Sequence, residues 1–160
     1  MKYFDEIKKS MDWLNTKSDT LFLGQAVEYD GTAMTRTLRD VDASKKLEMP
    51  VNEEMQTGIT LGMALNGTVP ISIYPRWNFL LLGANQLVNH IDKIKIMSSG
   101  GYTPKIIIRT SIGSQRPLHP QHQHIADFTG GFKAMCDTID IIRLDEPYQI
   151  FDSFKYAYER

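Results

Sequence analysis

Short apolar segments rich in β-branched residues alternate along this chain with segments of helical periodicity. Four of them, at 20–24, 69–74, 105–110 and 139–144, read "TLFLG", "VPISIY", "KIIIRT" and "IDIIRL". A strand with one face in water alternates polar and apolar residues, whereas these segments are apolar almost throughout. Helices must therefore cover both faces of the sheet that they form. The pattern predicts an α/β fold with three layers, α/β/α, around a mainly parallel sheet.

Helical patterns fill the spaces between these strands. Apolar residues recur at helical spacing from Phe4 to Leu14, and further helices are expected near 32–41, over 53–65, from about Phe79 to Met97, and in 148–160. In parallel sheets, ligands bind beyond the carboxyl ends of the strands. Gln25, the turn "PRWNF" at 75–79 and the polar loop at 110–124 are expected there.

Composition narrows the classes of partner. A chain of 160 residues predicts one domain, 1–160. Its 18 Lys and Arg nearly balance its 19 Asp and Glu, so no overall field favours nucleic acid or an acidic membrane surface. The lone Cys136 cannot form an internal disulfide, and no apolar run is long enough to span a membrane. We expect a cytoplasmic protein without a membrane or nucleic-acid partner.

The segment "NEEMQTGITLGM" combines two acids with two glycines. Asn52 is a good N-cap residue, and Glu53 and Glu54 favour the positive end of a helix dipole, so helix-start chemistry accounts for the acids. It does not account for Gly58 and Gly62, each of which costs about 1 kcal/mol relative to alanine inside a helix. Glycines four residues apart share one helical face. They indicate close approach of another backbone or of a ligand.

Other candidates allow more than one interpretation. Phe79 is either a core residue or an aromatic surface for a ligand. The segment "HPQHQH" contains His119, His122 and His124, and it is either a solvated loop or a site for acid-base chemistry. A zinc site is a third interpretation, which the spacing of the residues favours less. We therefore predict no metal ligands in this chain. Arg76 and Arg116 are surface arginines or contacts for an anionic substrate.

Five stretches together resemble one family. Glu53, Gly58-Ile59 and Gly62-Met63 match the motif of the pyrimidine-binding domain of thiamine-diphosphate enzymes, in which a glutamate precedes two glycine-plus-apolar pairs. The segments "FLGQAVEYDGTAMTRTL", "SIYPRWNF", "NQLVNHIDKI" with "IMSSGG", and "QHQH" occur in the family's order. The nearest likeness is to the β subunit of 2-oxo acid dehydrogenase E1 components, and a more distant one is to the central domain of transketolase.

The resemblance implies roles for four residues. Glu53 is similar to the glutamate that bonds N1′ of the aminopyrimidine ring, and Phe79 to the aromatic residue against that ring. His122 resembles the active-site histidine, so Glu53 and His122 are the implied catalytic residues. Gln25, with Glu53 and Phe79, is an implied cofactor contact, although many relatives have glutamate at the position of Gln25. A carboxyl group is needed because the cofactor's amino group acts as a base only when N1′ shares a proton.

The resemblance also implies a partner. The family's Gly-Asp-Gly motif for the diphosphate and Mg²⁺ has no counterpart, since the nearest string is "YDG" in another element. The expected protein is therefore a β-type subunit of a homo- or hetero-oligomer that completes its site with an α-type subunit holding most of the Mg²⁺ contacts. It would act on a 2-oxo acid or a related ketone donor. The alternative is a non-catalytic interaction or regulatory domain that retains the fold.

Overall fold

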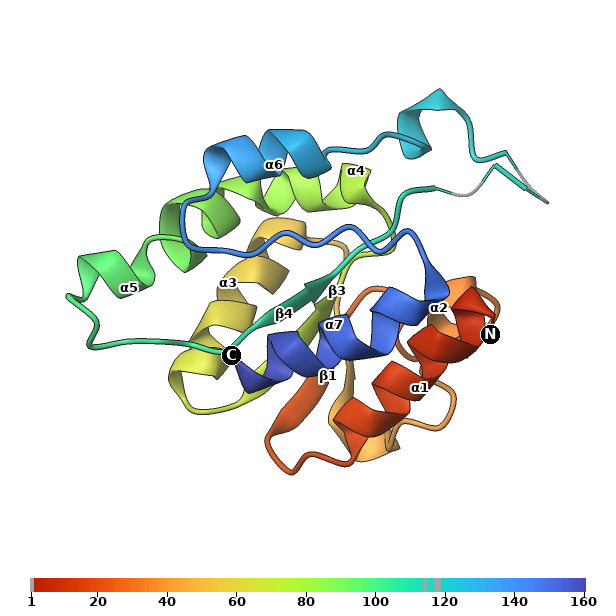
Figure 1. Cartoon of the computed structure of the whole chain (residues 1–160), viewed down its shortest axis with the longest axis horizontal. Coiled ribbons are helices and arrows are strands. Elements are labelled where there is room, and N and C mark those ends of the chain that lie inside the picture. Colours follow the sequence, from red (N-terminus) through yellow and green to blue (C-terminus); the bar gives the residue numbers. More distant parts are fainter. Residues whose placement is uncertain (1, 114, 117–118) are drawn as a thin grey trace.

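A four-stranded, wholly parallel sheet forms the centre of the molecule (Figure 1). The computed structural model describes residues 2–113, 115–116 and 119–160. The strand order is β2-β1-β3-β4, with β1 at Thr20–Gly24, β2 at Lys46–Glu48, β3 at Val69–Ile73 and β4 at Ile107–Arg109. Helices lie on both faces, so the predicted three-layer α/β/α fold is confirmed.

The helices form two layers, one on each face of the sheet. One contains α1 (Tyr3–Asn15), α2 (Ala33–Arg36) and α7 (Pro147–Glu159); the other contains α3 (Glu53–Leu65), α4 (Trp77–Leu80), α5 (Ile94–Met97) and α6 (Thr129–Met135). Short turns of other helix types complete the chain, with η1 at Ala43–Lys45, η2 at Leu81–Gly83, η3 at Gln86–Ile91 and η4 at His122–His124. Within the described residues, no helix has the length and apolar character needed to cross a membrane.

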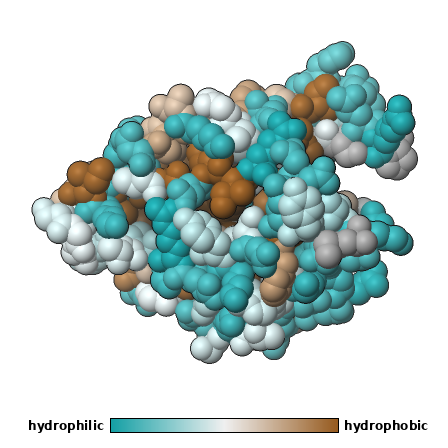
Figure 2. Space-filling view, in the orientation of Figure 1, coloured by the Kyte–Doolittle hydropathy of each residue, from teal (hydrophilic) through white to brown (hydrophobic). Residues whose placement is uncertain are grey.

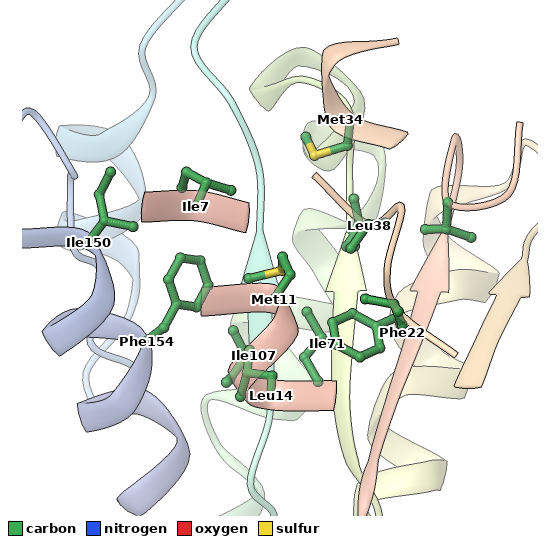
Figure 3. Close-up of a cluster of buried hydrophobic side chains, with 13 residues drawn as sticks. Ile7, Met11, Leu14, Phe22, Met34, Leu38, Ile71, Ile107, Ile150 and Phe154 are labelled. Carbon is green, nitrogen blue, oxygen red and sulfur yellow. The ribbon is translucent and has the colours of Figure 1, made fainter. Parts of the chain in front are cut away.

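The main hydrophobic core lies between the sheet and the layer of α1 and α7. In Figure 3, Met11 and Leu14 of α1 lie between Phe154 of α7 and the sheet residues Ile71 and Phe22. Met11 and Leu14 are fully buried, as the helical spacing of apolar residues predicts. A second cluster lies under the other layer and contains Tyr74, Trp77, Leu80, Leu87 and Phe132.

One predicted helix is irregular and one predicted strand is absent. The expected helix from Phe79 to Met97 is present as successive helical segments of different types, α4, η2, η3 and α5. Gly83 within it lies against α3, since a Cβ there would be 2.4 Å from Thr57 Oγ1. Residues 139–144, where a strand is expected, do not form one. Their apolar side chains Ile139 and Ile141 instead pack against the cluster around Phe132.

A buried carboxylate fixes the start of that segment. The Asp92 side chain has no exposed surface, and it accepts hydrogen bonds from the backbone N–H groups of Asp137, Thr138 and Ile139 at 2.7–3.1 Å. Lys93 Nζ lies 2.8 Å from it. Burial alone would raise the pKa of Asp92, but the bonds from Lys93, Asp137 and Thr138 outweigh burial and hold this pKa well below its ordinary value.

We expect Asp92→Asn to lower the free energy of unfolding by roughly 2–4 kcal/mol at neutral pH, because the amide removes the charge that these donors stabilise. Folding lowers the pKa of Asp92, so its stabilisation is complete above the ordinary value of 3.8 and is lost as the pH falls further. Urea unfolding at several pH values checks both points. Asp137→Asn is the matched control, since that side chain is 72% exposed. An equal loss in both variants, or a difference that persists undiminished at pH 2, would contradict this account.

Candidate functional site

The predicted site residues follow the carboxyl ends of the parallel strands. Gln25 follows β1, Glu53 begins α3, Phe79 lies in α4 after β3, and His122 lies in η4 after β4. The structure brings them together as two contacting groups. Gln25 contacts Glu53, and Phe79 contacts the histidine turn η4 through His124.

Glu53 and Glu54 occupy opposite environments at the start of α3. Asn52 caps the helix, with its Oδ1 accepting a hydrogen bond from the backbone N–H of Met55 at 2.9 Å. Glu53 is 3% exposed, whereas Glu54 is exposed. Gln25 Nε2 donates to Glu53 Oε1 at 2.9 Å. Among the described residues only Oε1 has a hydrogen-bond donor, so the second carboxylate oxygen remains available to a ligand.

Two hydroxyl groups, linked by a hydrogen bond, hold the backbone carbonyl of Glu53. Thr57 Oγ1 donates to the Glu53 carbonyl at 2.6 Å, and Tyr74 Oη lies 2.6 Å from the same hydroxyl. Because Thr57 uses its proton on Glu53, Tyr74 is the donor to Thr57. Burial raises the pKa of Tyr74, although the hydrogen bonds with Ser72 and Thr57 oppose this. Tyr74 therefore remains a protonated phenol and can keep this role.

Further polar contacts fix α3 on the sheet. Gln56 is fully buried and donates through Nε2 to Ser72 Oγ and to the Ile73 carbonyl, both at 3.1 Å. Thr60 Oγ1 donates to the same Ser72 hydroxyl at 2.9 Å. Hydrogen bonds depend on direction as well as distance, so this network restricts the rotation and translation of α3 more than apolar packing alone would.

The turn that carries Gln25 is equally constrained. Gly24 has φ +143°, and a Cβ there would lie 2.1 Å from the Ile73 carbonyl oxygen, so only glycine fits. The next residue but one, Ala26, also has a positive φ, of 58°. The Glu48 carboxylate accepts hydrogen bonds from the backbone N–H groups of Ala26, Val27 and Glu28 at 2.8 Å. These contacts hold the turn, and with it Gln25, against Glu53.

The histidines divide between solvent and the aromatic residue. His122 is exposed, and its ring contacts that of His119 with 5.8 Å between the centroids. His124 is partly buried, and its ring contacts Phe79 edge-on with 5.6 Å between the centroids. Phe79 itself is partly buried. Thus His124, to which the sequence assigns no role, is the histidine in contact with Phe79.

The two candidate arginines differ in exposure. Arg76 is partly buried at the start of α4, and Arg116 is exposed. In the part of the chain that the structure describes, no three histidine, cysteine or acidic side chains are grouped to hold a metal ion. Two surface hollows lie on either side of Ile142 and Arg143, and none of the predicted site residues lines either one.

Sequence reasoning missed the residues that support the site. These are Thr57, Tyr74 and Gly83. Thr57 and Tyr74 are 17 positions apart in the sequence, and Gly83 contacts Thr57 from another element. Contacts between elements have no local sequence signal. The polar residues Glu53, Gln56, Thr57 and Thr60 recur at helical spacing along α3, and this pattern could have suggested a polar contact with the sheet.

Several curated proteins similar to this chain are β subunits of pyruvate dehydrogenase E1 components. The chain is 28% identical over 132 residues to the mitochondrial β subunit of the pyruvate dehydrogenase E1 component of Ascaris suum, covering 80% of this chain and 36% of that protein. The corresponding subunit of Porphyra purpurea is 29% identical over 124 residues, covering 74% and 37%. That of Caenorhabditis elegans is 28% identical over 142 residues, covering 86% and 40%. No protein-family model matches the chain.

These relatives and the three-layer fold confirm the resemblance to the pyrimidine-binding domain of thiamine-diphosphate enzymes. Within that class, the similarity is to β subunits of pyruvate dehydrogenase E1 components. The match spans little more than a third of the length of each of the first relatives.

Gly83 and Gly62 provide a matched pair for testing the support of Glu53. A Cβ at Gly83 would lie 2.4 Å from Thr57 Oγ1 and 3.1 Å from the Glu53 carbonyl oxygen, whereas one at Gly62 would meet nothing within 4 Å. We expect Gly83→Ala to destabilise the chain by roughly 1–3 kcal/mol through overpacking. Gly62→Ala should stabilise it by up to about 1 kcal/mol. Denaturant unfolding of the two variants checks this, and a neutral Gly83→Ala would contradict the close packing of η2 on α3.

Proposed function

We propose that this chain is a β-type subunit that supplies the aminopyrimidine-binding half of a thiamine-diphosphate enzyme. The observation that carries the proposal is Glu53, a buried carboxylate at the first turn of α3 with one oxygen bonded to Gln25. It occupies the glutamate position of the family motif in a chain similar to E1 β subunits. The proposal covers residues 1–160 as one transketolase-like pyrimidine-binding domain.

The donor set fits the aminopyrimidine end of the cofactor. Thiamine diphosphate, when bound, supplies an acidic C2–H and an amino group that serves as its base. Glu53 would bond N1′ through its available oxygen and share a proton there, while Gln25 holds the other oxygen. Phe79 would present its ring to the pyrimidine and exclude water from it. His122, exposed in η4, would hold or move a proton on the substrate side of the site.

The second half of the site is proposed to come from an α-type subunit that binds the diphosphate and most of the Mg²⁺. The outer face of α3 supports such a partner. A Cβ at Gly58 or Gly62 would meet nothing within 4 Å, and Met55 and Ile59 on the same helix are 37% and 38% exposed. Leu82 of η2 is 67% exposed, and Figure 2 shows further hydrophobic side chains at the surface near the α5 end of the molecule.

The substrate class follows from the relatives. Their names describe pyruvate dehydrogenase E1 subunits, so we propose a 2-oxo acid or a related ketone donor as the small-molecule substrate. The same exposed face of α3 also fits the alternative of a non-catalytic interaction domain. The two functions differ in whether Glu53 takes part in chemistry.

Exchange of the C2 hydrogen of bound thiamine diphosphate for deuterium, measured in the assembled complex, tests the catalytic proposal. Glu53→Gln keeps a hydrogen-bonding group but cannot share the proton, so we expect exchange to slow by roughly 10²- to 10⁴-fold. Glu54→Gln is the matched control, because its exposed side chain lies on another face of α3. If only Glu54→Gln abolishes exchange, the assignment is wrong. If neither variant changes exchange, the interaction-domain alternative is favoured.

The assembly proposal predicts opposite effects of one substitution on the chain and on the complex. Gly62→Ala should leave the isolated chain at least as stable, but it should weaken association with the α-type subunit by roughly tenfold or more if that subunit packs closely on α3. Sedimentation with the α-type subunit measures association. The isolated chain should bind thiamine diphosphate weakly, with calorimetry showing recovery once the partner is added. Tight Mg²⁺-dependent binding by the chain alone would contradict a divided site.

A further inference from the structure

The histidine turn η4 directs two imidazoles in different directions. The His124 ring lies edge-on to Phe79, with 5.6 Å between centroids and 61° between planes. The exposed His122 ring contacts only His119 among the ring contacts of the described residues. Only Gln123 separates these histidines in the sequence, and the turn therefore determines which of them reaches Phe79.

The backbone around the turn is tightly constrained. Gln121, which precedes it, has φ 69° and ψ 166°, a conformation that is almost confined to glycine. A Cβ at Gly113 would lie 1.9 Å from the His124 carbonyl oxygen, so only glycine allows this approach. The same loop is tied to α4, because the Trp77 N–H donates to the Ser111 carbonyl at 3.0 Å. The loop after β4 thus links the start of α4 to the turn that carries His124.

The polar atoms of His124 do not explain its position. Its Nδ1 is buried without a hydrogen-bond partner among the described residues. Its Nε2 has one neighbour, Gln123 Nε2, at 3.3 Å. A buried imidazole nitrogen without a partner is unfavourable. The ring contact that His124 does make is the edge-on packing on Phe79.

We propose that His124 is a positioning residue of the thiamine site, which holds the Phe79 ring against the aminopyrimidine and leaves His122 directed toward the substrate. This role rests on the proposed function, since Phe79 is the proposed aromatic contact of the cofactor. It gives a role to a residue of the "QHQH" segment to which the resemblance assigns none. It also assigns separate tasks to the two histidines: His124 affects binding of the cofactor, and His122 affects turnover.

The contact itself can be tested in the isolated chain. The measurement is the NMR chemical shift of the histidine ring protons. Phe79→Leu should shift the signals of His124 and leave those of His122 nearly unchanged, because His124 is the histidine in contact with the Phe79 ring. His124→Gln and His122→Gln assign the signals. If the His122 signals move and those of His124 do not, the proposal is overturned.

The positioning role is tested in the complex with the α-type subunit, using thiamine diphosphate and Mg²⁺ as the probe. His124→Ala should weaken cofactor binding by about two- to tenfold, the range expected for loss of an aromatic pair, and His124→Phe should restore most of it. His122→Ala should lower kcat with little change in cofactor affinity. A His124→Ala complex with unchanged affinity, or one that His124→Phe does not rescue, overturns the positioning role.

Gly113→Ala provides a second variant, in which no histidine is replaced. Its Cβ would displace the His124 backbone, so cofactor affinity should fall as in His124→Ala while the chain stays folded by circular dichroism. Failure of the proposed function gives a different result: the unmodified complex would not bind thiamine diphosphate at all, and the positioning role would fall with it. If the unmodified complex binds thiamine diphosphate, and the His124→Ala and Gly113→Ala complexes bind it with the same affinity, the positioning role alone is overturned.

Discussion

The parallel pairing of β1 with β3 is the constraint on which the rest of the structure depends. Its register places Gly24 opposite Ile73, and at that point the backbones approach so closely that a side chain at position 24 could not fit. Both strands therefore end at the same edge of the sheet. The residues that follow them, Gln25 after β1 and the turn into α4 after β3, are brought to one place by backbone pairing rather than by contacts of their own.

The two faces of this sheet are stabilised in different ways. The face toward α1 and α7 is apolar, with Phe22, Ile71 and Ile107 packed against helical side chains. The face toward α3 contains Ser72 and Tyr74, which hydrogen-bond to polar residues of the helix. Apolar packing is not directional and tolerates small shifts, whereas a hydrogen bond loses strength when its geometry changes. The helix that must present Glu53 accurately is the one bound by hydrogen bonds.

The sequence was sufficient for the elements with a strong internal pattern. The strands β1 and β3 and the helix α3 were predicted at or within one residue of their observed bounds, because β-branched runs and a capped, periodic helix are local signals. The segment predicted from Phe79 to Met97 is helical but irregular, with 3-10 and π turns at Leu81–Gly83 and Gln86–Ile91. The packing of Gly83 on Thr57 could not be predicted, because that contact reaches outside the segment. The strand predicted at 139–144 is absent, and a distant contact is involved there. The amide of Ile139, the first residue of the segment, donates to Asp92, 47 positions earlier in the chain.

The candidate site shows the same division between local and distant information. Glu53, Gln25 and Phe79 could be selected from a motif and from their places after strands, and the structure puts Glu53 and Gln25 in contact. Their environment could not be selected in this way, because the Tyr74 hydroxyl, the glycine of η2 and the His124 ring reach the site from three other segments.

Helix α3 begins with two acids and then contains two glycines, and the surroundings of these residues differ. Inside this chain, nothing approaches Gly58 or Gly62, so the roughly 1 kcal/mol that each costs in a helix is not offset by any contact of the described residues. Glu53 on the same helix is buried by the chain itself and bonded to Gln25. The helix thus has one end organised by this chain and, at Gly58 and Gly62, positions where no described residue packs. The proposed site shared between two subunits would require that combination, because the carboxylate must be positioned before the partner arrives, while the partner's backbone needs a surface without side chains on which to pack.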